Sequence, residues 1–248
     1  MKDFTLEVCV DSVESALAAW KGGASRLELC GNLVIGGTTP SPALYEGIRK
    51  HSDIRIHALV RPRFGDFCYT QEEFQVILRE VQMYRSLGAE GVVVGVLQPD
   101  GSLDLERMKR LVEAAGDLSV TLHRAFDVCR NPEKTLEEAR RLGIATILTS
   151  GQRNTCLEGA DLLAKLVKEA GDGLEILIGS GVNAQAIQTL QPRTGARAFH
   201  MSGKKTLDSA MTYRKQGVSM GLPSLGEYEL WRTDEEEIRR AREVLEEL

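Results

Sequence analysis

Eight short segments with the residue make-up of β-strands recur along this chain, and helical segments alternate with them. The predicted strands cover residues 4–10, 26–30, 54–61, 90–96, 118–123, 145–150, 174–180 and 196–201. The predicted helices cover 13–22, 42–51, 70–87, 104–115, a stretch from 131, 157–170, a stretch from 183, and 235–247. Strands that alternate with helices build a parallel sheet, and eight such units match a closed barrel. We therefore expect an α/β fold, a single (β/α)8 TIM-type barrel, rather than an open doubly wound sheet.

The length of 248 residues is close to that of one such barrel, and no linker or change in composition divides the chain. We interpret residues 1–248 as one domain. One stretch interrupts the rhythm, because residues 203–232 show no clear periodicity. A segment of this length without secondary structure is usually functional. We expect a long loop or arm after the eighth strand, which acts as a lid over the barrel mouth or as a contact between subunits.

The formal net charge of −5 argues against nucleic acid as a partner, because nucleic acid requires a basic face. No apolar run is long enough to cross a membrane. The chain begins almost directly with a strand, which leaves no room for a secretory signal. Five cysteines, none spaced as C-x-x-C, suit reduced thiols better than a disulfide framework. These features predict a cytoplasmic protein without a membrane partner.

Some of the predicted strands alternate apolar and polar residues, namely those at 4–10, 26–30, 54–61 and 118–123. Parallel strands covered by helices are usually apolar on both faces. In the first strand, however, Leu6 and Val8 share one face while Glu7 and Cys9 share the other. One dry face and one polar face indicate strands whose polar side lines a site.

The active site of a barrel of this type lies at the carboxyl ends of its strands and in the loops that follow. The ionisable and thiol side chains expected at this mouth are Glu7, Cys9, Glu28, Cys30, His57, Arg61, Arg63, His123, Arg124 and Asp127. Histidine and buried glutamate transfer protons, and arginine binds anions. For an enzyme we expect catalytic roles for Glu7, Glu28, His57, Arg61, His123 and Asp127. The alternative is a structural network in which Arg26, Arg55 or Arg61 neutralises the glutamates.

Two cysteines, Cys9 and Cys30, each follow a glutamate by two residues on neighbouring predicted strands. Adjacent strands lie about 4.8 Å apart, so the two sulfurs could meet. Two thiolates with few other ligands suit Cu(I) better than magnesium or calcium. The alternatives are that both thiols are small buried apolar groups, or that the stagger of a barrel keeps them apart.

Glycine-rich turns follow the seventh and eighth predicted strands. Gly179 and Gly181 lie in the first turn, and Ser202 and Gly203 lie in the second. Barrels of this type often bind a phosphate there through backbone N–H groups and a helix N-terminus. Glycines also form tight turns without a ligand, so both interpretations stay open. No organic cofactor is indicated, because the sequence has no P-loop, no nucleophile elbow and no lysine at a strand end.

Several longer strings resemble the CutC family of copper-homeostasis proteins. They are LELC at 27–30, GGTTPS at 36–41, RPRFGDFCY at 61–69, HRAFD at 123–127, LTSGQ at 148–152 and YRKQGVSM at 213–220. The resemblance implies a cytoplasmic TIM-type barrel, often a homo-oligomer, with a role in copper tolerance through Cu(I) binding. It also implies that the cysteines of the first two strands, here Cys9 and Cys30, are the ligands.

The residues and the resemblance favour different functions. A copper carrier has no need for two histidines, two arginines and two carboxylates around one mouth, whereas an enzyme acting on a small anionic or phosphorylated substrate would use them all. We expect a CutC-type copper-homeostasis protein that binds Cu(I). The alternative hypothesis is a barrel enzyme of the lyase, isomerase or aldolase type. The expected partner is accordingly a copper ion or a small anionic molecule.

Overall fold

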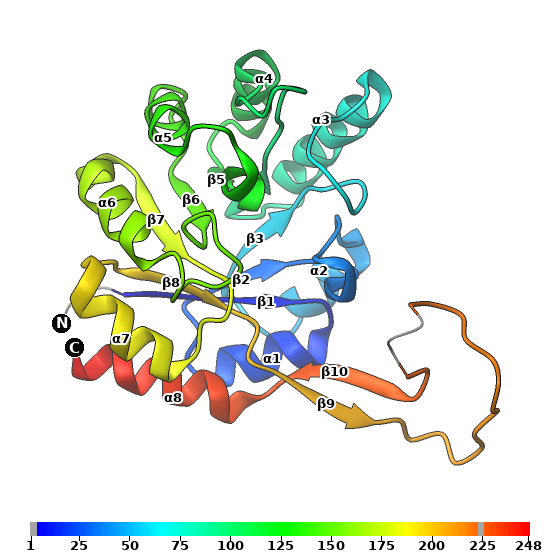
Figure 1. Ribbon diagram of the computed structural model, residues 1–248. Helices are drawn as coiled ribbons and strands as arrows, with labels where there is room; N and C mark the ends of the chain where they lie inside the picture. The colour runs from blue at the N-terminus through cyan, green and yellow to red at the C-terminus, as the bar shows by residue number, and fades with distance from the viewer. Residues whose placement is uncertain (1–3, 223–225) are drawn as a thin grey trace.

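Eight parallel strands form a closed barrel in sequence order, with the last strand paired to the first (Figure 1). The computed structural model describes residues 4–222 and 226–248. The strands are β1 (Thr5–Val10), β2 (Arg26–Leu29), β3 (Arg55–Leu59), β4 (Gly91–Val94), β5 (Ser119–Leu122), β6 (Thr146–Thr149), β7 (Glu175–Ile178) and β8 (Ala198–Met201). The predicted TIM-type barrel is confirmed, and each observed strand lies within the range predicted for it.

Helices alternate with the strands and surround the barrel (Figure 1). They are α1 (Val13–Lys21), α2 (Pro42–Arg49), α3 (Gln71–Ser86), α4 (Leu105–Ala115), α5 (Pro132–Arg141), α6 (Ala160–Ala170), α7 (Ala184–Thr194) and α8 (Glu235–Glu247), with short 3-10 turns η1 (Leu33–Ile35), η2 (Arg124–Val128) and η3 (Gly171–Gly173). Thr70 and Glu73 form the predicted capping box at the start of α3. Within the described ranges, no helix is both long and apolar enough to cross a membrane.

The side chains on the two faces of a barrel strand belong to different clusters, one between the barrel and its helices and one inside the barrel. Leu6 and Val8 of β1 belong to the large core between the barrel and its helices. Cys9, on the opposite face, packs with Cys30, Leu59 and Val93 in a separate cluster. Leu148, Leu177 and Ala198 form a third cluster on the other side of the barrel. The alternation read from the sequence therefore separates an outer apolar layer from a barrel interior that carries the polar groups.

Residues 203–232 are not irregular throughout. β9 (Lys204–Asp208) and β10 (Glu229–Thr233) form a two-stranded antiparallel ribbon that projects from the barrel past α1 (Figure 1). The ammonium of Lys204 lies 3.4 Å from the centre of the Trp231 ring, and the backbone N–H of Thr233 donates to Ser15 Oγ on α1. The side chains of β9 are all exposed, so no apolar face marked this strand in the sequence.

Candidate functional site

A cavity of about 440 Å³ opens at the carboxyl ends of the barrel strands. Its walls combine strand ends, the loops that follow them and the base of the β9–β10 ribbon. Six of the residues expected at the mouth or in the phosphate turns line it, namely Cys9, Glu28, Arg61, His123, Arg124 and Ser202. The ribbon contributes Lys204, Trp231, Arg232 and Thr233. The position and the volume are those of a small-molecule site in a barrel of this type.

Cys9, Glu28 and His200 form a cluster of metal-ligand type in the wall of this cavity. One ligand atom from each residue lies within 4.8 Å of the others. The three residues come from β1, β2 and β8, which are consecutive around the barrel. The closed sheet therefore brings together groups that are up to 191 positions apart in the chain (200 − 9).

His200 is held between two carboxylates. Its Nδ1 lies 2.8 Å from Oε1 of Glu7, and its Nε2 lies 3.7 Å from Oε2 of Glu28. Burial disfavours the charged ring, but contacts with Cys9, Glu7 and Glu28 outweigh burial and raise the pKa of His200 well above its usual value. The ring is thus oriented by Glu7, and its Nε2 faces Glu28.

The two glutamates differ in their ionisation. Glu7 also accepts from Nε of Arg26 at 2.5 Å, and although burial raises its pKa, Arg26 and His200 together hold that pKa well below the usual range. Burial raises the pKa of Glu28, with the charge of Glu7 adding to the effect and His200 opposing it. Glu7 is therefore a fixed negative charge, while Glu28 retains a proton more readily.

Cys30 lies beside this cluster rather than within it. The strand register pairs Cys9 with Glu28, so Cys30 lies two residues further along the chain, just past the end of β2. Its thiol donates to Oε2 of Glu28 at 3.5 Å, and burial together with the Glu28 charge raises the pKa of the thiol. Cys9 and Cys30 nevertheless share one interior cluster, with Glu28 in contact with the second thiol.

The two histidines expected to reach one ligand lie at different positions. His123 lines the cavity, whereas His57 is buried in the barrel interior and is not part of the cavity wall. Burial and the nearby charge of Arg26 lower the pKa of His57 to about 4. Its Nδ1 has no hydrogen-bond partner within the described residues. His57 is therefore a neutral interior group below the cavity.

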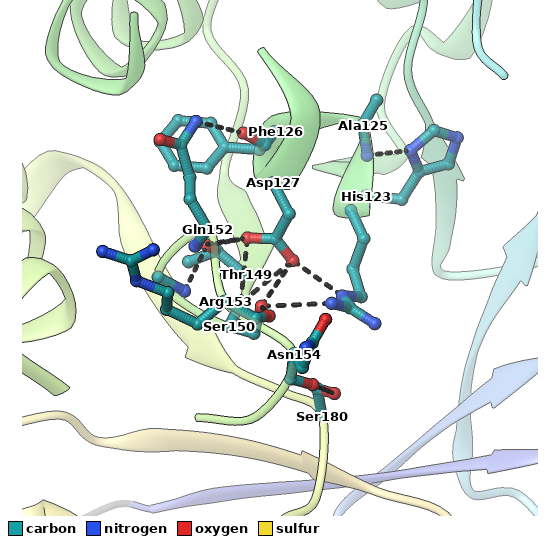
Figure 2. A network of polar contacts seen from close by, with 12 residues as sticks. His123, Ala125, Phe126, Asp127, Thr149, Ser150, Gln152, Arg153, Asn154 and Ser180 are labelled. Atoms are coloured by element: carbon teal, nitrogen blue, oxygen red, sulfur yellow. Dashed lines mark hydrogen bonds and ion pairs between the residues drawn. The ribbon is translucent and has the colours of Figure 1, made fainter. Parts of the chain in front are cut away.

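Asp127 is the centre of a hydrogen-bond network rather than an open carboxylate (Figure 2). It accepts from the backbone N–H of Ser150 at 3.0 Å, from that of Gln152 at 3.2 Å and from Nε of Arg124 at 2.7 Å. Arg124 also donates to Ser150 Oγ, and its side chain lines the cavity. Asp127 therefore positions Arg124 and the loop after β6.

The other predicted residues lie outside the cavity wall. Arg63 pairs with Glu73 at 2.6 Å and with Asp66 at 3.0 Å at the start of α3. Two of the glycines pack closely. A Cβ on Gly179 would lie 2.6 Å from Cδ1 of Leu148, and one on Gly203 would lie 2.5 Å from Cδ1 of Ile238. Gly203 also has a positive φ of 49°, and Gly181 has a positive φ of 76° in the turn before α7. These glycines have structural reasons to be present, and a phosphate role for them stays a prediction.

His200 is the site residue that sequence reasoning missed. The signal was present, because His200 has the same parity as Ala198 and Ser202, while Phe199 and Met201 face the outer core. The prediction for this part of the chain places the eighth strand at 196–201 but assigns candidate residues only to the turn after it, at Ser202 and Gly203. The alternation that identified Glu7 and Glu28 would have placed His200 inside the barrel as well.

Comparison with known proteins agrees with this geometry. Residues 4–205 match the model of the CutC family. The family protein CutC of Chromobacterium violaceum is 43% identical over 98% of this chain and 99% of its own length. The family protein CutC of Bacteroides thetaiotaomicron is 46% identical over 89% of each chain. The crystal structure of CutC from Streptococcus agalactiae, a protein proposed to act in copper homeostasis, has a TM-score of 0.77 at 29% identity and covers 80% of this chain. The chain therefore belongs to the CutC family.

Proposed function

We propose that this protein acts in copper homeostasis in the cytoplasm and binds Cu(I) at the cluster on β1, β2 and β8. The copper role follows the one proposed for its Streptococcus agalactiae relative. All five cysteines are free thiols, which suits a reducing compartment. The observation that carries the proposal is the Cys9–Glu28–His200 cluster, in which one ligand atom of each residue lies within 4.8 Å of the others and the Glu7 carboxylate orients the imidazole.

Two of the three clustered residues, the cysteine and the histidine, are of the ligand types that Cu(I) prefers. The thiolate of Cys9 and Nε2 of His200 are ligands that Cu(I) accepts, and Cys30 supplies a second sulfur beside them. Glu28 is a harder ligand, so its role here is to position the Cys30 thiol, which donates to its Oε2. The ion must displace protons from the thiols and from His200, and the neighbouring Glu7 remains ionised to keep the ring in place.

Anaerobic Cu(I) titration against a coloured competing chelator tests the proposal. We expect Cys9→Ser and His200→Gln each to weaken binding by about tenfold or more, since each removes one ligand. The Cys30→Ser variant measures how much the second thiol contributes to the Cu(I) affinity. Cys156→Ser is the matched control, because Cys156 is another buried free thiol but lies outside the cluster. Unchanged affinity in the Cys9→Ser/Cys30→Ser double variant and in His200→Gln would remove the site.

The size of the cavity favours a second candidate function. A volume of about 440 Å³ far exceeds the space that one ion needs, and Arg61 and Arg124 are in its wall. The second candidate is therefore a barrel enzyme that acts on a small anionic molecule, with Glu28 and His200 as the groups that transfer protons. A metabolite that co-purifies with the protein and is lost from the Glu28→Gln variant would support it. Absence of any retained metabolite from cell extract would count against it.

A further inference from the structure

Among the described residues, two buried N–H donors in the cavity wall have no acceptor at full hydrogen-bond geometry, although the Tyr69 hydroxyl lies near the Arg61 side chain. Within residues 4–222 and 226–248, Nε of Arg61 and Nε2 of His123 are buried and lack a hydrogen-bond partner. Both residues line the cavity, and their side chains are 8% and 4% exposed. A buried N–H group without an acceptor lowers the folding stability by about 1–3 kcal/mol. Two such groups in one wall therefore indicate that a ligand supplies the acceptor.

The tautomer of His123 follows from its contacts. Its Nδ1 accepts from the backbone N–H of Ala125 at 3.1 Å (Figure 2). Burial and the nearby charge of Arg61 lower the pKa of His123 to about 3, so the ring is neutral at physiological pH. A neutral ring that accepts at Nδ1 carries its hydrogen at Nε2. The free nitrogen of His123 is therefore a donor.

Arg61 likewise has one N–H group, at Nε, that remains free after its other donors are paired. Nη1 donates to the carbonyls of Gly36 and Gly37 at 3.1 Å each, and Nη2 donates to the carbonyl of Gly65 at 2.9 Å. These acceptors fix the guanidinium but carry no net charge, so they do not neutralise it. A buried guanidinium is stabilised most by an anion with oxygen acceptors.

Phe67 packs against both donors. The centre of its ring lies 4.7 Å from that of His123, and Cζ of Arg61 lies 5.1 Å from the Phe67 ring centre. Phe67 is partly buried, also lines the cavity and belongs to the loop between β3 and α3. Phe67 is therefore the side chain of the cavity wall that lies beside both groups with an unpaired nitrogen.

We propose that Arg61 and His123 form a subsite for an oxyanion, the carboxylate or phosphoryl group of a small molecule, which binds when the Phe67 ring turns aside. Arg124 lies in the same wall, where its guanidinium is paired with the Asp127 carboxylate at 2.7 Å. The subsite draws on β3, β5 and their loops, whereas the Cys9–Glu28–His200 cluster draws on β1, β2 and β8. It therefore does not rest on copper binding.

Calorimetric titration of the full chain with inorganic phosphate and with acetate tests this subsite. We expect saturable binding of at least one of them, and the preferred probe identifies the group. His123→Asn keeps an acceptor for Ala125 but removes the Nε2 donor, so binding should weaken about tenfold or more. His123→Gln restores an N–H near the position of Nε2 and should recover part of the loss. Phe67→Ala should strengthen binding, because the ring no longer has to move.

Two controls make the test decisive. Arg232→Gln removes a positive charge from the same cavity without touching either donor, and should change the affinity less than about twofold at physiological salt. Cys9→Ser should leave anion binding intact, which separates failure of this subsite from failure of the copper site. Absence of saturable binding to both anions, or equal losses in Arg232→Gln and His123→Asn, would overturn the proposal.

Discussion

Nδ1 of His200 lies 2.8 Å from Oε1 of Glu7, so an ion pair spans the seam where the last barrel strand meets the first. The same two strands close the sheet and supply Cys9 and His200 of the ligand cluster. Formation of the site is therefore coupled to closure of the barrel.

Replacing Glu7 by glutamine should weaken Cu(I) binding by about ten- to a hundredfold, because the carboxylate that orients His200 is lost. It should also cost about 3 kcal/mol of folding free energy, since Arg26 keeps a buried charge without its main partner. Chelator competition and urea unfolding measure the two effects. Glu175→Gln is the control, because Glu175 approaches Arg26 at 3.9 Å but belongs to β7 and not to the cluster. An equal loss of copper affinity in both variants would contradict the role of Glu7.

His57 should make the protein acid-sensitive. Its pKa is lowered in the folded state from 6.5 to about 4, so the unfolded chain takes up the proton first as the pH falls. The stability is complete above pH 6.5 and decreases until the folded state is protonated near pH 4. Between pH 7 and pH 5 the loss from this group is about 2 kcal/mol.

Urea unfolding of the native protein and of His57→Gln at pH 7, 6 and 5 measures this contribution. Glutamine does not titrate, so the stability difference between the two proteins should decrease as the pH is lowered. His51→Gln serves as the control, because His51 is exposed on the surface. A difference between wild type and His57→Gln that stays constant with pH would show that His57 titrates normally.

Asp127→Asn should destabilise the protein by about 2–4 kcal/mol. An amide places a donor where the carboxylate now accepts from the N–H groups of Ser150 and Gln152 and from Arg124. Denaturant unfolding gives the free energy. The exposed Asp100, which pairs with Arg130 at 3.0 Å, provides the comparison, and Asp100→Asn should change stability little. Similar unfolding midpoints for the two variants would mean that the hydrogen bonds of Asp127 do not stabilise the fold more than a surface ion pair does.

Replacement of residues 209–228 by an Asn-Gly turn tests the expected homo-oligomer. Asp208 and Glu229 are paired, so a two-residue turn closes the ribbon without disturbing the barrel. The removed stretch carries the exposed side chains Met211, Tyr213, Val218, Met220 and Leu222. If the arm joins subunits, sedimentation should show a smaller assembly at an unchanged thermal midpoint. The same assembly size in both proteins would exclude the arm as the contact.

The barrel could be predicted from the sequence because two kinds of local signal, the helix caps and the alternation of apolar and polar residues in strands, agree. Helix caps such as Thr70 and Asn183 mark where helices begin, and both side chains accept the expected N–H groups. The alternation in β1 and β2 also predicted which side chains face the interior. Such local signals depend on periodicity, which the chain carries residue by residue.

Local sequence signals do not predict how one strand is aligned with another. The register that places Glu28, rather than Cys30, opposite Cys9 depends on how the whole barrel staggers. His200 joined the cluster only through the pairing of β8 with β1, across almost the full length of the chain. The pairing of β9 with β10 was equally hidden, because both strands are mostly exposed and polar residues dominate their sequence.

The ribbon has a mechanical consequence. β9 and β10 run without interruption from the distal loop to Lys204, Trp231 and Arg232 in the cavity wall. A molecule bound to the exposed residues beyond β9, such as Met211 and Tyr213, would therefore be connected to the cavity wall through one continuous pair of hydrogen-bonded strands.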